Sequence, residues 1–216
     1  KYDVIIIGAG PSGIFCAYEL MRQKPDMKVL MIEKGRSIEK RQCPKRTTKV
    51  CVGCKPCSIT TGFAEAGAFS DGKLSLSPDV GGTLPEILGY EKAEELIKEA
   101  DNIYLKFGAD EKVYGIDDYE AIERIRAKAI RANLKLIECP IRHLGTEEGY
   151  KIYTRLQEHL LASGVEIKFM TMVQDIIIED GVAKGVVTDK EETYYADEIV
   201  SGIGREGSSW FEGICK

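Results

Sequence analysis

Residues 3–33 read DVIIIGAGPSGIFCAYELMRQKPDMKVLMIE, and this stretch predicts the fold. Residues 3–7 form a short apolar, β-branched run, which is typical of a buried strand. A glycine-rich turn follows over 8–13, then apolar residues at helical spacing as far as Gln23, and a second buried strand over 29–33. A strand, a tight turn, a helix and a strand in this order predict a βαβ unit, and therefore an α/β fold built on a parallel sheet.

The glycine-rich turn has the spacing Gly8-x-Gly10-x-x-Gly13, and it lies between a predicted strand and a predicted helix, as in dinucleotide-binding turns. Gly8 permits the tight turn, Gly10 lets a pyrophosphate approach the backbone, and Gly13 lets the helix pack closely on the strand. Pro11 and Ser12 begin the helix, whose N-terminus attracts the negative phosphates. The alternative is a glycine turn that serves only to reverse the chain.

An acidic residue, Glu33, ends the second predicted strand, twenty residues after the third glycine of the turn. A carboxylate at this place accepts hydrogen bonds from ribose hydroxyls, and it would repel a 2′-phosphate, so the site disfavours NADP. Lys34 and Arg41 follow in a basic stretch. We expect one or both of these cations to reach the phosphates or the ribose of the cofactor.

The composition is that of a globular chain of one domain or slightly more: 216 residues, 44% hydrophobic and 30% charged. It excludes a disordered tail, a collagen-like fibre and a disulfide-framed miniprotein. The net charge of −5 argues against nucleic acid as the main partner. No apolar run reaches the roughly 18 residues that span a bilayer, and no secretory leader is recognisable. We therefore expect a cytoplasmic protein with a small-molecule substrate and no membrane partner.

Beyond residue 33 the pattern changes several times. Residues 34–61 are basic and have no apolar period, and a glycine- and serine-rich loop follows over 62–77. The remaining patterns predict helices over 85–106, 117–133 and 147–163, and strands over 165–169, 174–178, 182–187 and 193–200, with a hairpin turn at 180–181. We expect a discontinuous cofactor-binding domain over 1–83 and 144–216, with a Cys-rich loop at 38–60, and a mainly helical insert over 84–143.

Several segments carry a resemblance to known flavoproteins. GAGPSG (8–13), AYEL (17–20) and IEKG (32–35) resemble the flavin-binding class of the dinucleotide motif, as in glutathione-reductase-like flavoproteins. CKPCSITTGFAEAGAFSDGKLSLS (54–77), PIRHLGT (140–146) and GREGSSW (204–210) resemble the uncharacterised FAD-dependent dehydrogenases of the NAD(P)/FAD-dependent oxidoreductase family. The resemblance implies a Rossmann-type FAD/NAD(P)-binding domain with a β-hairpin or meander and a helical insert. It also implies a chain truncated after the cofactor half, because the resembled proteins continue into a substrate-binding region.

The resemblance also implies roles for residues distant from the first turn. In those flavoproteins a glycine-rich loop passes the isoalloxazine ring, a hairpin strand meets the adenine, and a later glycine turn returns beneath the cofactor. The corresponding residues here are Gly67, Ser70, Asp71, Gly72 and Lys73 in the loop, Val173 in the strand, and Gly202, Gly204 and Arg205 in the turn. Backbone N–H groups of such a loop can stabilise negative charge on a reduced flavin. Alternatively, residues 68–73 form an Asp-Gly turn with a solvated lysine.

Two side chains are candidates for catalysis. His143, one of only two histidines, is a candidate proton donor to the substrate or the flavin. Lys73 would balance the charge of a reduced flavin. For His143 the alternative is a structural role, which is the more common one for a single histidine.

Four cysteines in the basic stretch are the most unusual feature: Cys43, Cys51, Cys54 and Cys57. Two-residue spacings let thiolates converge on one metal, and four sulfurs suit zinc or an iron–sulfur cluster. Neighbouring basic residues would lower the pKa of the thiols. Two alternatives remain open, which are a redox-active dithiol beside the flavin and a cysteine-rich loop with neither role.

Together these patterns predict an FAD-dependent oxidoreductase, a dehydrogenase whose flavin accepts hydride or electrons from an unknown substrate or from NAD(P)H. One alternative is a flavin protein coupled to an iron–sulfur or zinc centre that acts as an electron carrier. Another is a non-catalytic module that binds a dinucleotide. A third is a short protein similar to thiazole synthases, which use the same fold with NAD.

Overall fold

The computed structural model describes all residues from 1 to 216, and the chain divides into two compact units. The first unit contains Lys1–Phe69 and Tyr153–Lys216, and the second contains Ser70–Ile152. The predicted helical insert, 84–143, lies inside the second unit, and its standing as a separate domain stays a prediction. None of the helices has the length and the apolar composition needed to span a membrane.

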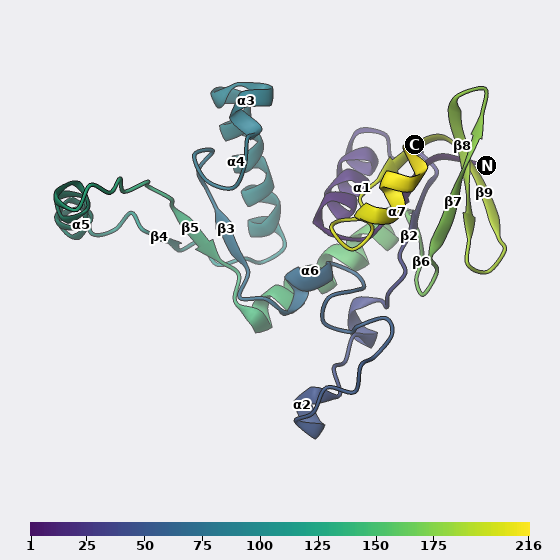
Figure 1. Cartoon of the computed structure of the whole chain (residues 1–216), viewed down its shortest axis with the longest axis horizontal. Coiled ribbons are helices and arrows are strands. Elements are labelled where there is room, and N and C mark those ends of the chain that lie inside the picture. Colours follow the sequence, from purple (N-terminus) through teal and green to yellow (C-terminus); the bar gives the residue numbers. More distant parts are fainter. The chain divides into compact units, whose positions relative to one another are not determined.

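The first unit is built on a six-stranded sheet with the order β6-β2-β1-β9-β8-β7 (Figure 1). Its strands are β1 (Tyr2–Ile7), β2 (Val29–Ile32), β6 (Glu166–Lys168), β7 (Val173–Glu179), β8 (Val182–Thr188) and β9 (Thr193–Ser201). Strand β1 pairs in parallel with β2 and β9, and β2 pairs in parallel with β6. Strands β7, β8 and β9 form an antiparallel meander. The predicted α/β fold, with its βαβ unit and hairpin, is confirmed.

The apolar pattern of the first 32 residues explains the core of this unit. Strand β2 is buried along its whole length, and so are the last four residues of β1, because both lie inside the sheet. Helix α1 (Pro11–Gln23) connects them and packs on both, burying Ile14, Ala17 and Met21 among others at helical spacing. The core continues into the meander through Val173 and Val186.

The segment between β2 and the second unit contains only short elements, as its irregular composition predicts. These are the 3₁₀ turn Ile38–Lys40, helix α2 (Lys45–Thr48) and the 3₁₀ turn Glu65–Phe69. Ile38 and Phe63 are fully buried and hold the segment to the unit. The amide of Gln157, in helix α6 (Thr146–Ala162), accepts a hydrogen bond from the backbone N–H of Ile38 at 3.0 Å. Helix α7 (Ser208–Ile214) ends the chain.

The second unit has a three-stranded antiparallel sheet, three complete helices and the beginning of α6. The sheet order is β3 (Lys73–Ser75), β5 (Ile141–His143), β4 (Val113–Tyr114), and the helices are α3 (Leu84–Leu88), α4 (Tyr90–Lys106) and α5 (Tyr119–Arg131). The helix predicted over 85–106 is divided at Gly89, whose φ of 81° no α-helix accommodates. The buried guanidinium of Arg142 pairs with Asp101, which ties β5 to α4.

Candidate dinucleotide site

The turn between β1 and α1 is closely packed at two of its glycines. A Cβ on Gly13 would lie 2.1 Å from the carbonyl oxygen of Gly8, and a Cβ on Gly8 would lie 2.6 Å from the carbonyl oxygen of Gly202. Gly8 also has a φ of +98°, a backbone conformation that residues with side chains rarely adopt. The turn therefore needs glycine at both positions, because Gly8 has a positive φ and faces Gly202, and Gly13 faces the Gly8 carbonyl.

Helix α1 begins directly after Gly10, with Pro11 at its first position. Its first turn contains no acidic residue, and no side chain caps its N-terminus. The N–H groups of a first helical turn have no partners within the helix, and the helix dipole places partial positive charge there. The sequence of α1 thus leaves this end suited to an anion that another part of the molecule or a ligand supplies.

Glu33 fixes the turn to the end of β2. Its side chain is buried, and its two carboxylate oxygens accept hydrogen bonds from the backbone N–H of Ala9 at 2.8 Å and of Gly35 at 2.7 Å. Each carboxylate oxygen has a second lone pair, so both can still accept a further hydrogen bond. Glu33 lines a cavity of about 490 Å³ in the first unit.

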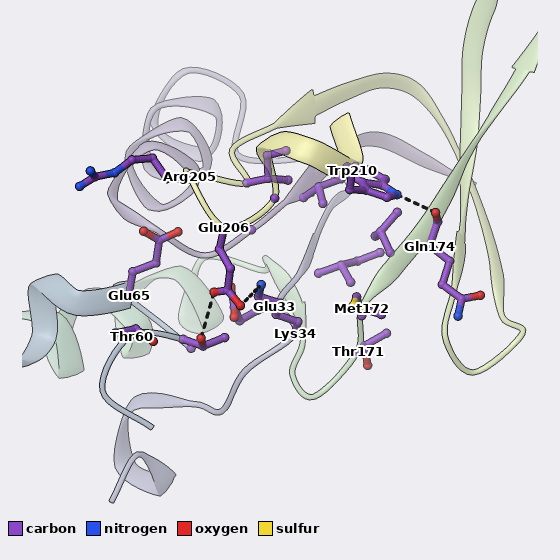
Figure 2. A pocket seen from close by; sticks show the side chains of 18 residues that line it. Glu33, Lys34, Thr60, Glu65, Thr171, Met172, Gln174, Arg205, Glu206 and Trp210 are labelled. Atoms are coloured by element: carbon purple, nitrogen blue, oxygen red, sulfur yellow. Dashed lines mark hydrogen bonds and ion pairs between the residues drawn. The ribbon is translucent and has the colours of Figure 1, made fainter. Parts of the chain in front are cut away.

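This larger cavity lies at the ends of β1 and β2, beside the start of β7 and under the segment that leads into α7 (Figure 2). Its volume is in the range of small-molecule sites. One part is apolar, and there the indole of Trp210 is held by a hydrogen bond of 2.7 Å from its Nε1 to the carbonyl oxygen of Gln174. The lining residues are Ile7, Gly8, Ile32, Glu33, Lys34, Thr60, Thr61, Gly62, Glu65, Thr171, Met172, Val173, Gln174, Ile203, Arg205, Glu206, Gly207 and Trp210.

A polar group of three side chains lies at one side of the larger cavity. The ammonium of Lys34 is 3.0 Å from a carboxylate oxygen of Glu206 (Figure 2). The hydroxyl of Thr61 donates to the other oxygen at 3.3 Å. The pair ties the segment before α7 to the end of β2. Sequence reasoning missed Glu206 and Thr61, although both belong to the segments that carry the resemblance.

A second cavity, of about 270 Å³, lies at the N-terminus of α1. It is lined by Gly10, Pro11, Ser12, Glu65, Ser201, Gly202, Ile203, Gly204 and Phe211. The structure thus brings the first turn together with the predicted later turn at Gly202 and Gly204. Only Glu65 and Ile203 line both cavities. Burial raises the pKa of the Glu65 carboxyl, and the nearby carboxylates of Glu33 and Glu206 raise it further.

Arg41 and Gly67 are among the residues that are predicted to contact the cofactor but line neither cavity. Arg41 is 2% exposed, and its guanidinium donates hydrogen bonds to the carbonyl oxygens of Ser58 at 3.1 Å, Ile59 at 2.6 Å and Phe63 at 2.5 Å. Burial lowers the pKa of Arg41 to about 10. The structure therefore uses Arg41 to hold the 58–63 loop, and its contact with a cofactor stays a prediction. The second residue is Gly67, which lies next to the Tyr153 ring.

The remaining loop residues lie in the second unit, around the pairing of β3 with β5. Lys73 is opposite His143 in that pairing. A carboxylate oxygen of Asp71 is 3.3 Å from the ammonium of Lys73, and the other is 3.7 Å from Nδ1 of His143. The backbone N–H of Gly72 donates to the Ser70 hydroxyl at 3.2 Å, which stabilises the turn. Both catalytic candidates therefore share one carboxylate, and their roles stay predictions.

The cysteines are all free thiols. Cys51 and Cys57 are exposed, Cys43 and Cys54 are partly buried, and no group of three or more metal-ligating side chains is arranged to hold an ion. The predicted metal set is thus not assembled in the structure. Hydrogen bonds from the Thr60 side chain and from the backbone N–H groups of Thr60 and Ile59 lower the pKa of the Cys57 thiol, and Arg41 contributes to the same effect.

Comparisons with known proteins show which proteins the chain is similar to. The model of the family described as FAD dependent oxidoreductase matches residues 3–205. A digeranylgeranylglycerophospholipid reductase of Sulfolobus acidocaldarius is 27% identical over 209 residues, which cover 94% of this chain and 34% of the reductase. A thiamine thiazole synthase of Coprinopsis cinerea is 52% identical over 33 residues, which are 15% of this chain and 10% of the synthase.

A solved structure shows the same fold. The chain superimposes on glycine oxidase from Bacillus cereus with a TM-score of 0.52 and 18% identity, over 93% of this chain and 55% of the oxidase. The chain therefore spans about half the length of the oxidase and a third of the length of the reductase.

Proposed function

Because the chain belongs to the FAD dependent oxidoreductase family, we propose that it is the FAD-binding part of a flavin-dependent oxidoreductase. The observation that carries the proposal is the buried carboxylate of Glu33, which holds the glycine turn and lines a cavity large enough for a nucleoside. The activity of the whole enzyme belongs to the same proposal, since the chain spans only part of its relatives.

The residues present fit the adenosine and pyrophosphate of the cofactor. In the larger cavity, Glu33 would accept hydrogen bonds from ribose hydroxyls, and the adenine would lie among apolar groups that include Val173 and Trp210. At the second cavity, the α1 N-terminus and the bare backbone of Gly10 would receive the pyrophosphate. The flavin, when bound, supplies the chemistry of hydride or electron transfer.

His143 and Lys73, both in the second unit, are the proposed groups for proton transfer and charge balance. The Nδ1 of His143 is 3.7 Å from a carboxylate oxygen of Asp71, so the imidazole has an acidic neighbour beside it. Lys73 shares that carboxylate and would favour negative charge nearby. We keep both as catalytic candidates. The relatives' names specify different substrates, a lipid for the reductase and glycine for the oxidase, so we assign none to this chain.

NAD(P)H is the proposed reductant if the flavin is not reduced by the substrate. A second candidate function, in which the thiols carry electrons or bind zinc or an iron–sulfur cluster, is favoured by one observation: the lowered pKa of Cys57 in a basic stretch. Seven free thiols suit a reducing compartment, and we propose the cytoplasm as the site of action.

The test is a titration of the purified chain with FAD, followed by absorption spectroscopy and calorimetry. We expect stoichiometric binding, and bleaching of the flavin bands by dithionite or by NAD(P)H. Glu33→Gln should weaken binding of FAD, whereas Glu198→Gln removes an exposed charge outside both cavities and should not.

Absence of FAD binding would refute the proposed cofactor site. A bound flavin that no reductant bleaches would favour the non-catalytic module instead. Elemental analysis of the same preparation shows whether the cysteine thiols bind a metal. Stoichiometric zinc or iron would establish a bound zinc ion or iron–sulfur cluster.

A further inference from the structure

The carboxylate of Glu65 lies against the backbone of the two glycine turns. A Cβ on Gly10 would lie 2.7 Å from Oε1 of Glu65, and a Cβ on Gly204 would lie 3.3 Å from the same oxygen. The carboxylate therefore occupies space that the missing side chains of two glycines open. In dinucleotide sites this is the space in which the pyrophosphate approaches the first turn.

The backbone that carries Glu65 is anchored to that turn. The N–H of Ala64 donates to the carbonyl oxygen of Ala9, in the turn, at 2.8 Å. The N–H of Glu65 donates to the carbonyl oxygen of Gly62, in its own loop, at 2.8 Å. Ala64 and Glu65 have φ values of +66° and +46°, a left-handed conformation that side chains disfavour. The backbone is thus held in an unfavourable conformation that directs the Glu65 carboxylate over the turn. For a phosphate to reach the turn, only the side chain of Glu65 has to move.

Glu65 also stands between the two cavities, because it and Ile203 line both of them. Adenosine alone needs only the larger cavity. A ligand with phosphates on the adenosine must continue past Glu65 to the α1 N-terminus. Displacement of the carboxylate is therefore required for the second kind of ligand and not for the first.

The charges around Glu65 act in opposite directions. The α1 N-terminus attracts its carboxylate, since the first turn of α1 has no acid of its own. The cations of Lys34 and Arg41 also favour the charged form, whereas burial and the carboxylates of Glu33 and Glu206 oppose it, so that the pKa of Glu65 is raised. Protonation of Glu65 would remove its attraction to the helix terminus.

We propose that Glu65 is the gating residue of the dinucleotide site: its carboxylate takes the place of a phosphate at the α1 N-terminus and swings away when a pyrophosphate binds. This inference rests on the proposed function, because only a nucleotide that extends between the two cavities needs the space. The gate lowers the affinity for phosphorylated ligands and leaves the affinity for adenosine unchanged.

Calorimetry with ADP and with adenosine tests the gate on four forms of the full chain. These are the wild type, Glu65→Ala, the isosteric Glu65→Gln, and Glu198→Gln, which removes the same charge at an exposed position lining neither cavity. If the open side-chain position is a minor population, its enrichment raises affinity in proportion. We expect ADP to bind both Glu65 variants about tenfold more tightly than wild type. Adenosine should bind all four forms alike.

The pH dependence gives an independent readout. As the pH falls through the raised pKa of Glu65, the wild-type gate weakens, so the ratio of ADP affinities between Glu65→Gln and wild type should approach one. Because ADP titrates in the same way in both measurements, its own protonation does not affect the ratio of the two affinities at any pH.

Equal ADP affinity in wild type and both variants would overturn the gate while leaving the nucleotide site intact. Weaker ADP binding by the variants would also overturn it, since Glu65 would then support the ligand. If neither ADP nor adenosine binds any form, the proposed cofactor site fails and the gate with it. If Glu65→Ala does not fold, the ADP affinity of Glu65→Gln alone tests the gate, because this variant keeps the volume of the side chain.

Discussion

Replacing Arg41 should destabilise the loop of residues 58–63. Its guanidinium is buried and donates to three backbone carbonyls within residues 58–63. Arg41→Met keeps most of the aliphatic volume and removes every donor. The three carbonyl oxygens would then lose their partner in a place where water does not easily replace it.

The magnitude follows from the hydrogen bonds lost and the desolvation relieved. A hydrogen bond to a charged group contributes about 1.5–3 kcal/mol, so three could contribute on the order of 6 kcal/mol. Removing the buried charge also removes the free-energy cost of its desolvation, which offsets part of this loss. Removing one partner of a buried charged network lowers the free energy of unfolding by about 3–5 kcal/mol. We therefore expect Arg41→Met to lower the free energy of unfolding by about 4 kcal/mol, with a smaller loss for Arg41→Lys, which keeps the charge but loses the fork.

Urea unfolding followed by circular dichroism measures these differences. The matched control is Arg36→Met, because the side chain of Arg36 is exposed and its replacement should change the free energy by no more than about 0.5 kcal/mol. A loss below about 1 kcal/mol for Arg41→Met would refute the structural role. Full stability combined with lost FAD affinity would instead establish the cofactor contact that the sequence predicts for Arg41.

Three further changes test the site and the thiols. Gly13→Ala should destabilise the chain by about 2–3 kcal/mol in urea unfolding, because its Cβ would lie 2.1 Å from the carbonyl oxygen of Gly8; an unchanged midpoint would contradict this packing. Glu33→Gln should lower stability by about 1–3 kcal/mol, since one backbone N–H then faces an amide donor, and a neutral result would show that both bonds are dispensable. Alkylation of Cys57, followed by mass spectrometry, should have a pH midpoint below that of an ordinary thiol, and Thr60→Val should raise the midpoint; coincident profiles would remove the basis for a reactive thiol.

The fold of the first unit could be predicted because its signals are local. The buried strands, the turn glycines and the helix period of residues 2–32 all agree, and a parallel βαβ unit is the main arrangement that satisfies them. The hairpin turn at Asp180 and Gly181 could be predicted because Asp-Gly is a preferred pair for two-residue turns, and both residues have the positive φ that such a turn requires. The division of the long helix at Gly89 was missed, because a single glycine is tolerated in many helices.

The candidate site was predictable only where spacing carries the information. Glu33 and the turn glycines lie within one motif, so their contacts follow from the chain order. Glu65, Glu206 and Trp210 line the cavities from distant segments, and their placement depends on tertiary packing that no periodicity reveals. The cysteines have regular spacing, but spacing alone does not bring their thiols together, and the metal set stays a prediction.

Trp210 is the only tryptophan in the chain, and it lines the larger cavity with its indole nitrogen fixed to the Gln174 carbonyl oxygen. Tryptophan fluorescence of this chain would therefore report from a single position beside the larger cavity. Occupation of the cavity, and loosening of the last helix, can thus be followed optically without a label. The unmodified chain therefore contains its own reporter for ligand binding and for movement of α7.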